Sequence, residues 1–83
     1  MKFVAEIDVM PLKELLDPQG KAVQHSMVNL HITGVADVRI GKHISMAVEA
    51  ASKDEATAKV DEACKKLLAN RIMETYHFTL NEI

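Results

Sequence analysis

Asp17-Pro18-Gln19-Gly20 is the first stretch whose residue types could do chemistry, because an acid, a proline, an amide and a glycine stand where a helix begins. Backbone N–H groups at a helix start can hold an anion. Here Asp17 would repel an anion and Pro18 lacks an N–H group. We therefore expect Asp17 to cap the helix by accepting backbone N–H groups, with Pro18 at the first helical position.

The other reactive side chains form no catalytic or metal-binding pattern. His25 and His31 are six residues apart, which separates them around a helix, and His43 and His77 belong to other segments. Cys64, the single cysteine, falls on an apolar helix face, where an inert thiol is expected. Each glycine stands alone, so no phosphate-binding loop is indicated. We expect no catalytic residue, no cofactor site and no metal site in this chain.

Length and charge limit the classes of function. The chain has 83 residues and a formal net charge of −2, which favours one domain over residues 1–83 and disfavours a nucleic-acid partner. Its apolar runs are too short to span a bilayer, and its acidic N-terminal segment does not resemble a signal peptide. These features favour the cytoplasm. A domain this small, without a disulfide, is expected to self-associate as a dimer or larger.

Apolar and polar residues alternate in four segments, which predicts four β-strands. Gly41-Lys42 fits a two-residue hairpin turn between the second and third of them. One helix is expected from Pro18 to Gly34, and another after the capping box formed by Ser52 and Glu55. The predicted strands cover residues 2–10, 35–41, 43–50 and 72–80.

The order strand–helix–strand–strand–helix–strand predicts an α+β fold of the ferredoxin-like βαββαβ type, with a four-stranded antiparallel sheet and both helices packed on one face. The second helix should bury one apolar stripe against that sheet. The stripe consists of Ala56, Val60, Ala63, Cys64 and Leu67.

Asp37, Arg39 and Lys42 form a charged group beside the predicted hairpin. Two interpretations remain open. The group is a solvated strand edge whose charges prevent aggregation, or it is a polar docking surface for another protein.

Three blocks of the sequence together resemble the PurS family, the small subunit of formylglycinamide ribonucleotide amidotransferase. The resemblance covers nearly the whole chain in length and element order. The blocks are Asp17-Pro18-Gln19-Gly20 with Val23-Gln24, Val38-Arg39-Ile40-Gly41-Lys42, and Leu67-Leu68-Ala69-Asn70 with Glu74.

This resemblance implies a required but non-catalytic subunit of phosphoribosylformylglycinamidine synthase in purine biosynthesis. It implies two partners: the glutaminase PurQ, which releases ammonia, and the synthetase PurL, which uses ATP and magnesium. The small subunit would bridge them and support ammonia transfer, and would itself form a dimer or tetramer. Asp17, Gln19 and Gln24 become candidates for contact with a neighbouring subunit, together with Asp37, Arg39 and Lys42.

A regulatory domain of the same βαββαβ topology that binds a small molecule is the alternative. Such a domain would show ligand-dependent heat in calorimetry, whereas an assembly subunit would restore glutamine-dependent activity to its partners.

Overall fold

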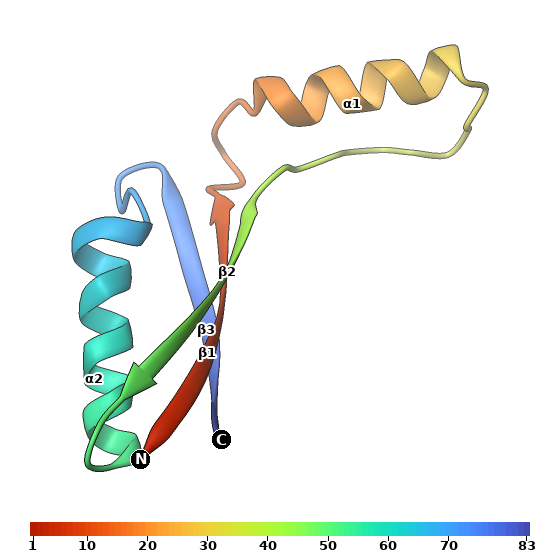
Figure 1. Cartoon of the computed structure of the whole chain (residues 1–83). Coiled ribbons are helices and arrows are strands. Elements are labelled where there is room, and N and C mark those ends of the chain that lie inside the picture. The colour runs from red at the N-terminus through yellow and green to blue at the C-terminus, as the bar shows by residue number, and fades with distance from the viewer.

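The computed structural model describes residues 1–83 and contains a small sheet, two α-helices and a short π-helix (Figure 1). In chain order the elements are β1 (Lys2–Pro11), α1 (Pro18–Asn29), β2 (Lys42–Glu49), α2 (Lys53–Ala63), the π-helix η1 (Cys64–Leu68) and β3 (Glu74–Glu82).

The sheet has three strands in the order β2-β1-β3, and β1 is antiparallel to both neighbours. The alternation in β1 dictates its central place. Phe3, Ala5, Ile7 and Val9 point to one face and are at most 1% exposed. The residues between them point to the open face. The prediction of strands near 2–10, 43–50 and 72–80 is confirmed, with ends shifted by one or two residues.

The core lies between β1 and α2. Ala56 and Val60 of α2, and Cys64 at the start of η1, are fully buried against the strand residues. The apolar side chains of the outer strands cover the margins of this core and are half-buried. They are Ile44, Met46, Val48, Tyr76, Phe78 and Leu80.

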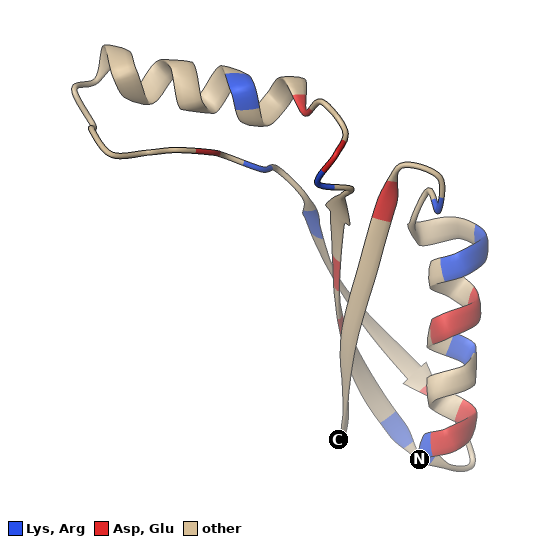
Figure 2. Ribbon diagram, turned by 180° about the vertical axis from the view of Figure 1, so that it is seen from behind, with Lys and Arg blue, Asp and Glu red and all other residues tan.

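The predicted capping box starts α2. The Ser52 hydroxyl accepts the Glu55 N–H at 3.2 Å, and the Glu55 carboxylate accepts the Ala51 N–H at 3.2 Å. Opposite charges also line the solvent side of the helix (Figure 2). The ion pairs there are Glu55–Lys59, Asp61–Lys65 and Glu62–Lys66.

The placement of Leu67 in the core is wrong. The helix widens into the π-turn Cys64–Leu68, which inserts one extra residue into the helical repeat. As a result Leu68 turns toward the core and Leu67 is 81% exposed. The α-helical spacing that includes Val60 and Cys64 stops at this turn.

The expected four-stranded sheet is also wrong. Residues 35–41 are extended, but no backbone–backbone hydrogen bond involves them, and Gly41-Lys42 makes no hairpin. The chain instead runs straight into β2. A Cβ on Gly41 would lie 2.4 Å from the Val9 carbonyl oxygen, so this glycine permits close approach to the end of β1 rather than a turn.

The expectation that both helices cover one face is wrong for α1. This helix extends beyond the end of the strands and packs alongside residues 35–41 (Figure 1). We call residues 12–41 the arm. Because of the arm, the radius of gyration is 16.4 Å, whereas a compact chain of this length would have about 12 Å.

Helix α1 begins at Pro18 as predicted but ends at Asn29, before Gly34. His31 and Gly34 adopt positive φ angles of 61° and 85°, and they turn the chain back along the helix. No helix in the structure combines the length and apolar character that a membrane crossing requires.

Candidate functional site

The six side chains predicted to contact a partner lie along the arm and where it joins the sheet. Four of them, Asp17, Gln24, Arg39 and Lys42, donate or accept hydrogen bonds within their own chain. Asp37 forms an ion pair, and the exposed Gln19 side chain makes no hydrogen bond. The structure thus brings five of the six into contacts that shape the arm.

Asp17 joins the two sides of the arm. Its Oδ1 accepts the Gly20 N–H at 3.1 Å, which is the predicted helix cap. Its Oδ2 accepts the Ile40 N–H at 2.8 Å, a contact between residues far apart in sequence. The Ile40 and Gly20 N–H groups hold the pKa of this carboxyl below its usual value. The carboxylate therefore caps helix α1 and also ties the start of the helix to the returning chain at Ile40.

Gln24 holds the returning chain further along α1. Its Nε2 donates to the Ala36 carbonyl oxygen at 3.0 Å and approaches that of Val35 at 3.4 Å. Near the start of the helix the two sides come closer still, because a Cβ on Gly20 would lie 1.9 Å from the Val38 carbonyl oxygen. Only glycine allows this approach.

Arg39 closes the base of the arm. Its guanidinium donates to the carbonyl oxygens of Leu12 at 3.2 Å and Leu15 at 3.0 Å, and also to that of Lys13. Its Nε lies 3.5 Å from Asp37 Oδ2, and its side chain is only 22% exposed. A permanent cation with several donors suits this cluster of carbonyl groups.

Lys42 lies where the arm enters β2. Its ammonium donates to the Leu68 carbonyl oxygen at 3.2 Å, at the end of η1. The contact satisfies a terminal helix carbonyl, a favourable place for a cation. Lys42 therefore fixes the first residue of β2 to the end of the second helical segment.

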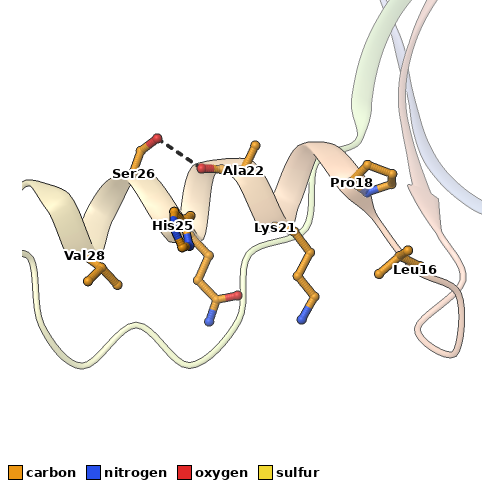
Figure 3. Close-up of a pocket in the computed structure, with 8 residues that line it drawn as sticks. Leu16, Pro18, Lys21, Ala22, His25, Ser26 and Val28 are labelled. Carbon is orange, nitrogen blue, oxygen red and sulfur yellow. Dashed lines mark hydrogen bonds between the residues drawn. The ribbon is translucent and has the colours of Figure 1, made fainter.

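The arm also presents an open groove along one side of α1, with a volume of about 850 Å³ (Figure 3). Helix α1 carries a single charged residue, Lys21, in contrast to α2 (Figure 2). Leu16 and Val28 stand at the two ends of the groove and are 75% and 67% exposed. The other residues that line the groove are Pro18, Lys21, Ala22, Gln24, His25 and Ser26.

Sequence reasoning missed a charged cluster on the open face of the sheet. His43 Nδ1 lies 2.6 Å from Asp8 Oδ1, and its Nε2 lies 2.5 Å from Glu6 Oε2. Ser45 donates to the other oxygen of Glu6 at 2.9 Å. The bonds to Asp8 and Glu6 raise the pKa of His43, and the bonds from His43 and Ser45 lower the pKa of Glu6. Knowing the strand register, which sets residue 43 opposite residue 8, would have revealed this cluster.

The remaining reactive side chains do not gather into a single site. Burial raises the pKa of the Cys64 thiol, which lies in the core and not in a cleft. The Tyr76 hydroxyl is hydrogen-bonded to Asp61, which raises the pKa of Tyr76 and lowers that of Asp61. No group of three or more histidine, cysteine or carboxylate side chains is arranged to hold a metal ion. The most distinctive surface of the structure is therefore the exposed arm.

Known proteins are similar to this chain over nearly its whole length, including both the sheet and the arm. The family described as PurS: Phosphoribosylformylglycinamidine (FGAM) synthase matches residues 4–82. The PurS subunit of phosphoribosylformylglycinamidine synthase from Bacillus subtilis is 44% identical over 73 residues, which is 87% of this chain and 86% of that protein. The Synechocystis subunit is 41% identical over 83% of this chain and 69% of its own length.

Two solved structures have the same fold. Bacillus subtilis PurS is similar with a TM-score of 0.87 and 38% identity, over 96% of this chain and 99% of that one. A chain in the structure of PurLQS from Thermotoga maritima is similar with a TM-score of 0.89 and 31% identity, over 98% of this chain and 99% of that one.

Proposed function

This chain belongs to the PurS family of phosphoribosylformylglycinamidine synthase, and on that premise we propose that it is a small, non-catalytic subunit of that enzyme. In this role it assembles with a PurL synthetase and a PurQ glutaminase. It bridges the two and supports the passage of ammonia for the glutamine- and ATP-dependent conversion of formylglycinamide ribonucleotide. It acts in purine biosynthesis in the cytoplasm.

One observation carries this proposal: the similarity to a chain of the Thermotoga maritima PurLQS structure extends over 98% of the residues. It therefore includes both the sheet with its helix and the protruding arm. A protein that keeps an arm of this form is equipped to contact more than one neighbour, because the arm exposes surface on several sides (Figure 1).

As part of the same proposal, ATP and magnesium act on the synthetase subunit and this chain holds neither. This chain contributes a rigid binding surface to the complex and no reactive group. Asp17, Gln24 and Arg39 keep the arm in one conformation, so that its exposed surface is pre-organised for binding. Gln19 and the largely exposed Asp37 are the predicted contact residues that remain open to a neighbour.

Reconstitution tests this function. Purified PurL and PurQ are assayed for glutamine-dependent turnover with and without this chain, and ammonia-dependent turnover of PurL serves as the control. We expect this chain to be required for the glutamine-dependent reaction and to leave the ammonia-dependent reaction nearly unchanged. Full glutamine-dependent turnover without this chain would refute the proposal.

The alternative of a regulatory βαββαβ domain rested on a four-stranded sheet. That sheet is absent, since residues 35–41 belong to the arm and not to a hairpin. No observation on this structure favours it.

A further inference from the structure

A tight turn joins the end of η1 to the start of β3 and holds two large apolar side chains in solvent (Figure 1). We call residues 70–74 the β3 turn. Within it, Ile72 is 84% exposed and Met73 is 52% exposed. A single exposed isoleucine is common on protein surfaces and needs no explanation. This isoleucine differs from that ordinary case because its backbone is firmly held.

Asn70 organises the β3 turn through hydrogen bonds from both its backbone and its side chain. Its carbonyl oxygen accepts the N–H groups of Met73 at 3.0 Å and Glu74 at 2.6 Å. Its side-chain oxygen accepts the Ile72 N–H at 3.1 Å, and its own N–H donates to the Glu74 carboxylate at 2.7 Å. The backbone of Ile72 is therefore already ordered, so little backbone freedom is lost when this side chain meets a partner.

The β3 turn is also tied to the base of the arm. The Leu12 N–H donates to the Met73 carbonyl oxygen at 2.9 Å, and the Leu12 carbonyl oxygen accepts the Arg39 guanidinium at 3.2 Å. A pocket of about 300 Å³ lies between the turn and the first residues of the arm. It is lined by Pro11, Leu15, Leu16, Asn70, Met73 and Glu74.

The β3 turn and this pocket together form what we call the base surface. Ile72 offers an apolar side chain that can enter a recess on another protein, and the pocket offers a recess for an apolar side chain of that protein. Side chains that fill pockets in this way contribute most of the binding energy at many interfaces. Leu16, which lines the pocket, is 75% exposed, so apolar surface continues from the turn to the arm.

Charge indicates the kind of partner that fits the base surface. Residues 65–73 contain three of the ten cationic residues of the chain and no acid. The two lysines among them are ion-paired with acids one helical turn earlier, whereas no ion pair involves Arg71. A partner with a carboxylate beside the recess for Ile72 would complement this guanidinium. A two-fold contact with a second copy of this chain is disfavoured, because it would bring the same cations together.

We propose that the base surface is the docking site for a partner subunit of the enzyme, and that this partner presents an apolar recess for Ile72, an apolar side chain for the pocket and a carboxylate for Arg71. This inference rests on the function proposed above and assigns a contact outside the six side chains predicted from the sequence. A bridging subunit needs two separate contacts, and the base surface supplies one that is distinct from the outer part of the arm. Because the β3 turn is bonded to Leu12, a partner bound here also fixes the arm relative to the sheet.

Titration of Ile72→Asp into PurL and PurQ, with glutamine-dependent turnover as the readout, tests the proposal. We expect the concentration that gives half of the maximal turnover to rise about tenfold or more. The melting temperature of the variant and its own mass by light scattering should stay those of wild type, because the side chain is exposed. The matched control is Ile83→Asp, which alters an isoleucine that is 72% exposed just beyond the opposite end of β3 and should titrate as wild type does. Arg71→Glu should weaken activation in the same direction as Ile72→Asp.

Oxidation of the wild-type chain by hydrogen peroxide provides a second measurement that does not depend on a variant folding. Peroxide transfers one oxygen atom to the methionine sulfur, which gives a sulfoxide and water. We expect Met73 to be oxidised several-fold more slowly when PurL and PurQ are present than in the chain alone, by mass spectrometry. Met1 is the matched control, since it is 55% exposed at the opposite end of the sheet, and its rate should not change.

The outcomes separate this inference from the proposed function. If the wild-type chain activates PurL and PurQ but Ile72→Asp activates them at the same concentration, the docking site is overturned and the function stands. Oxidation of Met73 that is as fast in the active complex as in the chain alone would also overturn the docking site. If the wild-type chain does not activate PurL and PurQ, the proposed function fails, and the docking site fails with it.

Discussion

Asp17 and Arg39 each bind backbone groups from segments far away in sequence, and these contacts define the arm. The cap role of Asp17 could be predicted from Asp-Pro at a helix start. Its second bond, to Ile40, could not, because it depends on the chain folding back along α1. Arg39 was predicted at a surface for partners, whereas its guanidinium is largely occupied by carbonyl groups of its own chain. A role of either residue in partner contact stays a prediction.

Asp17→Ala should loosen the arm locally. It removes the acceptor of two N–H groups, and loss of a helix cap costs about 0.5–2 kcal/mol. We expect the Gly20 and Ile40 amides to exchange roughly 2- to 30-fold faster by NMR, with little change in the sheet amides. Asp37→Ala is the matched control, since Asp37 accepts neither N–H. Unchanged exchange at Ile40 in Asp17→Ala would show that the second bond does not hold the arm.

His43 should make stability depend on pH. Its pKa is raised above 6.5 in the folded state, so its contribution is fully present below pH 6.5 and is lost as the pH rises through the folded value. The pKa of Glu6 is lowered below 4.5, so its contribution is present above pH 4.5 and is lost at more acidic pH. Both contributions are present together between pH 4.5 and 6.5.

Urea unfolding of wild type and His43→Gln measures this dependence. The groups that face His43 are Glu6, Asp8 and Ser45, and His77 lies opposite Asp8 on the other neighbouring strand. We expect wild type to exceed His43→Gln most in stability near pH 5.5 and least near pH 9. A difference that does not vary with pH would contradict the assignment of the charged cluster.

At the scale of elements, alternation predicted β1 well because its apolar face meets α2. The same alternation in residues 35–41 predicted a strand of the sheet, and that was wrong. Alternation indicates which side chains share a face of a strand. It does not indicate which other strand, if any, forms hydrogen bonds with that strand. Likewise, the stripe through Val60 and Cys64 was correct until the π-turn, whose extra residue leaves no signal in α-helical spacing.

The π-turn makes opposite predictions for two positions that the sequence treats alike. Val60→Asp places an unpaired charge in a fully buried site, which costs several kcal/mol and should abolish cooperative melting. Leu67→Asp alters an exposed side chain and should shift stability by less than about 0.5 kcal/mol. Thermal unfolding compares them, and a large destabilisation by Leu67→Asp would argue against the π-turn.

Gly20→Ala separates helix propensity from packing in the arm. Propensity alone predicts that alanine stabilises an exposed helix by about 1 kcal/mol. The structure predicts the opposite, because the new Cβ would meet the Val38 carbonyl oxygen. We expect faster exchange of the Ile40 amide in Gly20→Ala. Slower exchange would mean that α1 and residues 35–41 are not in close contact.

The whole molecule spans 51 × 27 × 14 Å, which is an elongated form for a chain of 83 residues. Only ten residues are buried, so the surface left exposed is large for a domain of this size. Several large apolar side chains remain exposed on the arm, Leu16, Val28 and Leu30 among them. An elongated subunit whose arm exposes large apolar side chains is better suited to contact neighbouring subunits than to exist alone.

Membership of the PurS family could be inferred from three short blocks because they fall in the two regions that shape the molecule. Asp17, Gly20 and Gln24 act on one side of the arm, and Arg39 and Gly41 act on the other. The third block begins with the last two residues of the π-turn, Leu67 and Leu68, and continues past the end of the helical segment. Asp17, Gly20, Gln24, Arg39 and Gly41 make or permit contacts inside the chain, so these residues of the blocks report the shape of the arm rather than a docking residue.

The most direct test of assembly is the mass of the complex formed by this chain, PurL and PurQ on a sizing column with light scattering. We predict that the three proteins elute together, at a mass greater than that of PurL and PurQ mixed without this chain. Elution of this chain apart from a complex of PurL and PurQ, under conditions that support glutamine-dependent turnover, would contradict its role as a subunit that bridges them.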